Sequence, residues 1–376
     1  MFVNKLRNYL MGITSLMLWA GTAGADWTLN MTKGVTPISQ EVYELHMLIL
    51  WIVTIIGIGV FSVMFWSIFH HRKSKGAKAA QFHHSTVVEL SWTIIPILIL
   101  VGMAIPATKT LIKMEQTGDA DITVKITGYQ WKWKYDYLDE GFGFFSVLAQ
   151  DSRDASQRGS NIDPNTVDHY LLNVDKPIVL PVGKKVRLLT TANDVIHAWW
   201  VPALGWKRDA IPGFINDNWA IINEPGTYRG QCAELCGKDH GFMPIVLKAV
   251  PEDEYNAWVE EMKLAQAEAA SGADKEWTMD ELKTKGEEIY KNTCAVCHQA
   301  NGKGVPGTFP ALDGGAIVNG PAGEHVKLVL GGKNLMPAFA GQLSDADIAA
   351  VITYERNSWS NQTGDVVQPK DVKAAR

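Results

Sequence analysis

Two short cysteine-containing stretches hold most of the side chains in this sequence that could carry out redox chemistry. The first, QCAELCGKDHGFM at 231–243, places two cysteines, a histidine and a methionine within thirteen positions. The second, CAVCH at 294–298, places two cysteines one helical turn apart and a histidine directly after them. These two pairs account for all four cysteines of the chain. Close pairs of this kind indicate cofactor attachment more than a framework of disulfides.

CAVCH is the C-x-x-C-H pattern of covalent haem attachment. Cys294 and Cys297 can add to both vinyl groups of a porphyrin, and His298 then faces the iron. The alternatives are a thioredoxin-like redox pair and half of a zinc site, which the directly following histidine and the absence of a second C-x-x-C pair disfavour. The expected sixth ligand is Met336 in NLMPAF, because methionine is a soft ligand that raises the haem potential. The other candidate, His325 in GEHVKL, is expected to be an exposed helix residue.

The stretch at 231–243 has three interpretations. Zinc would need a second close cysteine pair to complete a tetrahedron, and only His240 is at hand as a third ligand. A disulfide across three intervening residues is possible in an oxidising compartment. The third interpretation is copper: Cys236, His240 and Met243 match the C-x₃-H-x₂-M ligand loop of a cupredoxin. Blue-copper sites take one further histidine from an earlier strand end, and His197 in DVIHAWW follows a predicted strand.

Cys232 is one thiolate more than a mononuclear copper site uses. Two thiolates can bridge two copper ions, each of which is then capped by one histidine. Met243 would be a weak ligand of one copper, and the main-chain carbonyl of Glu234 is well placed for the other. Sharing one unpaired electron between two metals keeps the geometry nearly constant on reduction, so electron transfer is fast. Soft thiolates favour copper in this role.

The elements that must position these residues begin with a membrane anchor. Residues 1–25 have a basic start, a short apolar stretch and Ala-Gly-Ala at 23–25, the layout of a secretory signal. Two uncharged apolar runs predict spanning helices at about 44–70 and 89–111, within a hairpin over 26–118. The loop between them carries four Lys/Arg and no acid, which places it in the cytoplasm and the remainder of the chain on the periplasmic side.

The remainder of the chain reads as a β domain followed by an α domain. Short alternating strands separated by Gly, Pro and Asn predict an all-β, Greek-key, cupredoxin-like domain over 119–252. A helix-prone linker is expected at 253–276, an all-α haem domain at 277–362 and a C-terminal tail at 363–376. A net charge of −5 without a long basic stretch argues against a nucleic-acid partner.

Residues 40–250 resemble subunit II of the haem-copper cytochrome c oxidases. The resemblance rests on the two-helix anchor and on GYQWKWKY, DVIHAWWVPALGWKRDAIPG and GQCAELCGKDHGFMPI. Residues 277–362 resemble a class I cytochrome c, so the whole chain is similar to the fused form found in caa-type oxidases. The family's binuclear copper ligands then fall on His197, Cys232, the Glu234 main chain, Cys236, His240 and Met243.

The resemblance also implies roles for three further side chains. The Glu234 carboxylate would reach a magnesium or manganese ion at the interface with subunit I, and Trp131 would be the point of electron entry. Glu89, at the cytoplasmic start of the second span, matches the family's proton-uptake glutamate. Two departures from the family stand out. Lys132 and Lys134 replace a tyrosine and a small residue, so added positive charge is expected beside the entry point.

The function implied is an electron-transfer subunit of a respiratory terminal oxidase in the bacterial inner membrane, with its metal domains in the periplasm. Electrons would pass from cytochrome c or another reduced donor to the fused haem, then to copper, then to subunit I for oxygen reduction coupled to proton pumping. The implied partners are subunits I and III and membrane lipid. The rival functions are the electron-entry subunit of another respiratory reductase, such as a nitric oxide reductase, and a copper chaperone or tethered cytochrome without an enzyme partner.

Overall fold

The computed structural model describes residues 30–78, 83–157, 159–271 and 275–376. The predicted signal segment 1–25 lies outside the described residues. The chain divides into two compact units, one formed by residues up to 113 with 202–205 and the other by 114–201 with 206–376.

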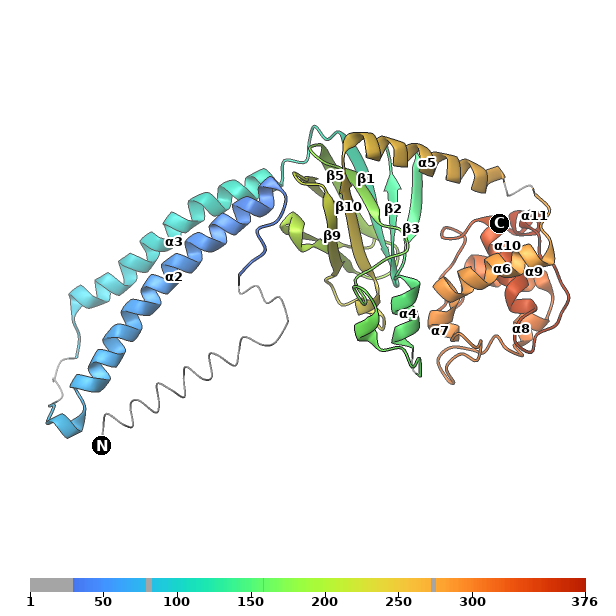
Figure 1. Ribbon diagram of the computed structural model, residues 1–376. Coiled ribbons are helices and arrows are strands. Elements are labelled where there is room, and N and C mark those ends of the chain that lie inside the picture. The colour runs from blue at the N-terminus through green and yellow to red at the C-terminus, as the bar shows by residue number, and fades with distance from the viewer. Residues whose placement is uncertain (1–29, 79–82, 158, 272–274) are drawn as a thin grey trace. The chain divides into compact units, whose positions relative to one another are not determined.

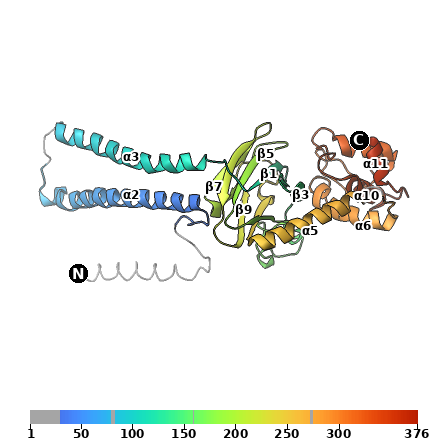
Figure 2. The ribbon, with the colours of Figure 1, turned by 90° about the horizontal axis from the view of Figure 1, so that it is seen from above.

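The first unit is a pair of long apolar helices that run side by side, α2 (Pro37–His70) and α3 (Thr86–Met114) (Figure 1 and Figure 2). Both helices are apolar enough and long enough to cross a membrane. Each helix begins earlier than the sequence predicts. In α2 a capping box between Thr36 and Ser39 sets the start, and Pro37 occupies the first turn, where its missing N–H is no loss. At the far end of the hairpin Thr110 and Lys113 both contact Glu41, which joins the two helices.

The β part of the second unit is a sandwich of two five-stranded sheets, as the alternating pattern predicts. One sheet has the order β3-β2-β1-β5-β8 and the other the order β4-β10-β9-β6-β7. The strands are β1 (Ile122–Tyr129), β2 (Lys132–Tyr137), β3 (Phe142–Ser146), β4 (Ile178–Pro181), β5 (Lys185–Ala192), β6 (His197–Val201), β7 (Trp206–Ala210), β8 (Asn216–Ile221), β9 (Gly226–Cys232) and β10 (Pro244–Val250). Inward-facing side chains such as Trp133, Tyr135, Leu188 and Trp199 are completely buried between the sheets and form the core.

Two helices accompany the sandwich, α4 (Gln150–Ser156) and α5 (Glu252–Ser271), and α5 occupies most of the expected linker. Trp258 on α5 packs edge-to-face on Tyr137 at 5.2 Å and on Phe142 at 5.5 Å between ring centroids. Lys263 adds an ion pair to Glu140 at 2.7 Å. The first turns of α5 are therefore an extension of the β domain.

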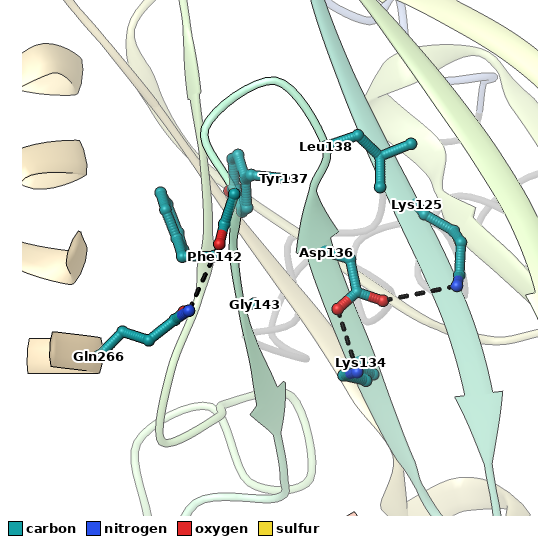
Figure 3. A pocket seen from close by; sticks show the side chains of 9 residues that line it. Lys125, Lys134, Asp136, Tyr137, Leu138, Phe142, Gly143 and Gln266 are labelled. Atoms are coloured by element: carbon teal, nitrogen blue, oxygen red, sulfur yellow. Dashed lines mark hydrogen bonds and ion pairs between the residues drawn. The ribbon is translucent and has the colours of Figure 1, made fainter. Parts of the chain in front are cut away.

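A hollow of about 620 Å³ lies where α5 passes the β2–β3 turn (Figure 3). Gln266 from α5 donates a hydrogen bond to the Gly141 carbonyl across it, at 3.3 Å. Asp136 on its floor pairs with Lys134 at 3.1 Å and with Lys125 at 3.8 Å. Its polar groups satisfy one another, so the hollow is a feature of helix packing and contains none of the cysteine stretches.

The α part, residues 277–376, is named here the haem module. Its helices are α6 (Met279–Ile289), α7 (Ala295–His298), α8 (Ala316–Asn319), α9 (Ala322–Gly331), α10 (Asp345–Arg356) and α11 (Pro369–Ala375), with a π-helical turn at Tyr290–Cys294. Ser344 caps α10, because its side chain accepts the main-chain N–H of Asp347. The residues expected to form a free tail are folded, because α11 buries Val372 completely against the core of the module.

Helices α6 and α10 pack so closely that one contact position has room only for glycine. A Cβ added to Gly286 would lie 2.1 Å from the Ala350 carbonyl oxygen, whereas a Cβ added to Gly323 on α9 would meet no atom within 4 Å. We expect Gly286→Ala to lower the free energy of unfolding of the haem module by about 1–3 kcal/mol, the usual cost of overpacking. Gly323→Ala should cause no loss. Hydrogen exchange of the α6 and α10 amides, measured at increasing urea concentration, gives the stability of each variant. Equal stability of the two variants would contradict the packing argument.

Candidate metal centres

Strand pairing brings together the histidine and cysteines that the sequence separates. His197 begins β6 and Cys232 ends β9, and these strands are antiparallel neighbours with Trp199 opposite Cys232. Cys236 follows in the next turn. One ligand atom from each of His197, Cys232 and Cys236 lies within 4.8 Å of the others, and all three residues are buried. The two sulfur atoms are 3.9 Å apart and both cysteines are free thiols, so the cluster is not a disulfide.

The remaining predicted donors surround the same two sulfur atoms. His240 Nδ1 lies 3.4 Å from Cys236 Sγ, and Met243 Sδ lies 3.6 Å from it. The Glu234 main-chain oxygen lies 3.4 Å from Cys232 Sγ. The structure thus gathers all six residues that the sequence nominates. We call His197, Cys232, Cys236, His240 and Met243 the sulfur–imidazole cluster.

Asp194 is a residue of the site that the sequence reasoning missed. Its carboxylate lies 2.9 Å from His197 Nε2 and also accepts the Gln130 main-chain N–H at 2.8 Å. In the neutral ring Nε2 therefore carries the proton. Nδ1 faces Cys232 Sγ at 3.9 Å, donates to that sulfur only when the ring is charged, and can bind metal once this proton is lost. The only signal in the sequence was an acid three residues before the histidine, which is too common a spacing to indicate a role.

The two thiols of the cluster differ in how easily they lose their protons when no metal ion is bound. The hydrogen bond from Cys236 and one from His197 lower the pKa of Cys232 despite its burial. The hydrogen bond that the Cys236 thiol donates to the Cys232 thiolate, together with burial, raises the pKa of Cys236 far above its ordinary value. Burial alone would lower the pKa of His197, but hydrogen bonds to Asp194 and Cys232 outweigh it and leave that pKa raised. One thiol therefore ionises readily, and the second needs a metal ion to displace its proton.

Aromatic side chains and a glycine enclose the cluster. Trp133 is fully buried, donates from Nε1 to the Met243 carbonyl at 3.2 Å and stands edge-on to the His197 ring, with ring centroids 5.9 Å apart. The half-buried Trp131 donates from Nε1 to the Cys236 carbonyl at 3.2 Å. A Cβ on Gly128 would lie 2.7 Å from His197 Cδ2. The backbone of β1 therefore presses directly against the imidazole.

The structure shows how the two lysines beside Trp131, which the sequence predicts to add positive charge there, are accommodated. Lys132 is only 7% exposed, and its ammonium lies 4.6 Å from the centroid of the Phe145 ring. Burial lowers its pKa to about 8. Lys134 is neutralised by Asp136 at 3.1 Å. The added positive charge is therefore present beside Trp131, but on Lys132 it is buried and on Lys134 it is paired with an acid.

Residues 294–298, which the sequence predicts to attach a haem, span the end of the π-helical turn and helix α7. Cys294 and Cys297 are free and half-buried, on either side of the first turn of α7. His298 is 8% exposed and its Nδ1 lies 2.8 Å from the Pro310 carbonyl oxygen, which leaves Nε2 available to an iron ion. Met336 is half-buried against the core of the module. This donor set fits a covalently attached haem.

The expectation that His325 is exposed is wrong. It is 2% exposed on α9, and its Nε2 lies 3.0 Å from a Glu355 carboxylate oxygen on α10. The apolar neighbours of His325 on its own helix carry it into the core of the module. Its Nε2 is therefore paired with an acid, whereas its Nδ1 is buried without a hydrogen-bond partner among the described residues, and Met336 stays the predicted sixth ligand.

Glu89 and Glu234 are the two acidic side chains to which the sequence assigns a role. Glu89 lies in the first turn of α3, where its carboxylate accepts the Ser85 main-chain N–H at 3.3 Å. The Glu234 side chain is half-buried between the two cluster cysteines. Among the described residues, the group of His, Cys, Asp and Glu that could hold a metal ion is His197, Cys232 and Cys236, and it does not include the Glu234 carboxylate.

The donor chemistry narrows the identity of the bound metal. Two thiolates, two imidazoles, a thioether and a carbonyl form a soft set that suits copper, and the sulfur pair can bridge two ions. Zinc would be satisfied with four of these donors and would leave a buried thioether unused. The fold and the site together define a membrane-anchored cupredoxin-like electron-transfer protein with a fused c-type cytochrome module.

Comparison with known proteins narrows this class to one family. Residues 122–250 match the model of the cytochrome c oxidase subunit II periplasmic domain and 24–110 that of its transmembrane domain. Residues 281–354 match the model of subunit III of cbb3-type cytochrome c oxidase. The chain belongs to the cytochrome c oxidase subunit II family. It is therefore a two-span membrane protein with an external domain, and its modules imply a copper centre and a haem.

Individual relatives agree with this assignment. A probable cytochrome c oxidase subunit 2 of Rickettsia bellii is 38% identical over 62% of this chain and 83% of its own. Cytochrome c oxidase subunit 2 of Alkalihalophilus pseudofirmus is 31% identical over 85% of this chain and 88% of its own, so the match extends into the haem module. Among solved structures, the chain is similar to the periplasmic domain of subunit II of cytochrome oxidase of Bradyrhizobium japonicum. The identity is 43%, the match covers 40% of this chain and 99% of that one, and the TM-score of 0.35 adds no weight to the assignment.

The close approach of β1 to His197 generates a test of the copper site. Gly128→Ala places a methyl group against the imidazole, so the ring must move away from the sulfur atoms. We expect copper affinity to fall about 10- to 100-fold, which corresponds to the usual 1–3 kcal/mol of overpacking. Gly118→Ala, where an added Cβ would meet nothing within 4 Å, is the matched control. Chelator competition measures both, and an unchanged affinity in the Gly128 variant would show that the ring is not a ligand.

Copper uptake should depend steeply on pH, because imidazole and thiolate bind metal only when deprotonated. The pKa of His197 is raised above 6.5 and that of Cys236 is raised as well, so protons compete with copper throughout the neutral range. We expect the apparent copper affinity to fall by about tenfold or more per unit as pH is lowered from about 8 to about 6. Asp194→Asn removes a cause of the raised His197 pKa and should move the steep region to lower pH. A flat profile would contradict the assignment.

Proposed function

We propose that this chain is the electron-entry subunit of a respiratory terminal oxidase and carries a binuclear copper centre and a covalently attached haem. The observation that carries the proposal is the convergence of two imidazoles and a thioether on two sulfur atoms 3.9 Å apart. A single copper ion uses one thiolate, and the second thiolate at bridging distance supports a pair of ions. When bound, the pair shares one electron between its ions and transfers it with little change in geometry.

In the proposed role an external donor, cytochrome c or another reduced carrier, gives its electron to the haem module, from which it passes to the sulfur–imidazole cluster. Cys294 and Cys297 would hold the haem through thioether bonds, and His298 and Met336 would bind its iron. One contact supports this order: within the second unit, Lys238 Nζ of the copper loop donates to the Val296 carbonyl between the two haem cysteines, at 3.2 Å. Trp131, bonded to the Cys236 carbonyl, would be the entry point to the copper.

Onward transfer requires a partner that contains the oxygen-reducing haem and copper, since the described residues hold no second set of haem ligands. Family membership implies that this partner is subunit I. We propose that Glu234 supplies a carboxylate to a magnesium or manganese ion at that contact, and that Glu89 admits protons to the complex for pumping. We further propose that the chain lies in a bacterial inner membrane, where it contacts membrane lipid and assembles with subunit III. The relatives named above are oxidase subunits, which favours an oxidase over a nitric oxide reductase.

Cys232→Ser tests the central claim. Loss of one bridging sulfur should leave at most one copper per chain, abolish the many-line paramagnetic signal of a mixed-valence pair and stop oxidation of the haem by the copper centre. Haem reduction by an external donor should continue, because the haem module is untouched. Metal analysis, paramagnetic resonance and stopped-flow absorbance on the full chain measure the three effects.

Leu235→Ala is the matched control, because this side chain lies in the same loop, is 79% exposed and offers no ligand. It should retain the copper content, the many-line signal and the rate of haem oxidation. If Cys232→Ser keeps a many-line signal, the bridging role is refuted. If both variants lose it, the loop rather than the sulfur atom is the cause.

A further inference from the structure

The segment after α10 folds back over the haem module and ties two distant parts of it together. Val367 is 4% exposed and Val372 is fully buried. Gln368 exchanges two hydrogen bonds with the main chain of Trp277, accepting its N–H at 3.0 Å and donating to its carbonyl at 2.8 Å. Helix α11 is therefore held in a defined place, which allows the residue that follows it to act on its neighbours.

That residue, Arg376, places its guanidinium on the chain just before α10. Nη1 donates to the Ala340 carbonyl at 2.5 Å, Nη2 donates to the Leu343 carbonyl at 2.9 Å, and Nε donates to an Asp345 carboxylate oxygen at 2.5 Å. A planar guanidinium can satisfy three acceptors in one plane, which an ammonium cannot. Charge-assisted bonds of this kind are stronger than neutral ones.

The chain that Arg376 holds is the second half of the segment that carries Met336. We call residues 332–343 the methionine loop. Its first half is a tight turn in which Lys333 and Met336 exchange main-chain hydrogen bonds at 3.0 and 2.9 Å. Gly332 has φ +69°, and a Cβ there would lie 2.5 Å from the Met336 carbonyl oxygen. The turn thus shapes the backbone at Met336.

Beyond the turn, Phe339 anchors the middle of the loop. It is 7% exposed and its N–H bonds the Val329 carbonyl at 3.0 Å. The carbonyls of Ala340 and Leu343 lie between this anchor and the Ser344 cap of α10. The Arg376 side chain, at the end of α11, donates hydrogen bonds to both carbonyls and so restrains residues 340–343.

We infer that Arg376 is a positioning residue for the sulfur of Met336. By holding 340–343 against α11, it restricts the loop to conformations in which the thioether stays at the haem face. This inference rests on the proposed function, in which Met336 is an axial ligand of the iron. An iron–thioether bond is weak, so the fraction of haem that keeps it depends on how few other conformations the loop can reach.

The test uses the haem-loaded full chain with an added ligand that competes with the thioether. Imidazole binds ferric haem when the methionine departs, and the haem absorbance spectrum reports the exchange. Arg376→Ala should bind imidazole about tenfold more tightly than the unmodified chain, because charge-assisted hydrogen bonds contribute at least that factor. The sulfur-to-iron charge-transfer band should weaken and the haem midpoint potential should fall, since methionine ligation raises it. Arg376→Lys, which keeps the charge but not the planar fork, should recover only part of each effect.

Two controls separate positioning from general stability. Lys373→Ala removes an exposed positive charge from the same helix and should change none of the readouts. Gly286→Ala weakens the module at the α6–α10 contact and should leave imidazole affinity unchanged while lowering stability. If imidazole affinity instead follows overall stability across the variants, or if Arg376→Ala binds imidazole as the unmodified chain does, the inference is overturned.

Met336→Leu distinguishes failure of the inference from failure of the proposed ligand. If that variant loses the sulfur band while Arg376→Ala is unaffected, Met336 is a ligand and only the role of Arg376 is refuted. If the unmodified chain lacks the band and Met336→Leu changes nothing, the ligand assignment itself fails. Should Arg376→Ala not fold, the Arg376→Lys variant decides, since it retains the contact to Asp345.

Discussion

Two buried sulfur atoms 3.9 Å apart cannot both carry negative charge unless a cation lies between them. This constraint explains the surroundings of the sulfur–imidazole cluster. The hydrogen bond from His197 favours one thiolate, and Asp194 orients that imidazole so that its other nitrogen faces the sulfur. The raised pKa of Cys236 shows the cost of the second charge in the absence of metal. A cation bound between the sulfur atoms would therefore offset the repulsion between two thiolates that the fold holds 3.9 Å apart.

The sandwich supplies the rigidity that such a site requires. His197 and Cys232 stand on antiparallel neighbours of one sheet, where main-chain hydrogen bonds determine their separation. The Gly128 backbone and the Trp133 ring, from the opposite sheet, close on the imidazole. Only Cys236, His240 and Met243 come from a loop, and the indole of Trp131 and the amide of Gln130 hold that loop through the Cys236 carbonyl. A stiff cage of this kind is what fast electron transfer with little reorganisation needs.

Much of the architecture could be predicted from the sequence, because it depends on local patterns. Uncharged apolar runs specify membrane helices, alternation specifies strands, and C-x-x-C-H indicates a cytochrome c domain. The failures concern residues whose role is decided by distant neighbours. Asp194 acquires meaning only when His197 turns toward it, His325 is buried by Glu355 from another helix, and Lys132 loses its exposure to an aromatic ring on β3. The segment 363–376 looked like a tail because only three of its side chains, those of Val367, Pro369 and Val372, are buried.

The sequence by itself determined the identities and spacings of the metal donors, since C-x₃-C-x₃-H-x₂-M lies on one loop whose chemistry is local. It also determined the order of anchor, β domain and haem module. The tertiary structure alone decided which of the possible donors meet and in which protonation state. His197 reaches the sulfur atoms through strand pairing across 35 positions of the chain, and Arg376 reaches the methionine loop across 33 to 36 positions. Such contacts form only when the entropy cost of closing the intervening loops is offset by burial of the core, a property of the whole fold and not of any motif.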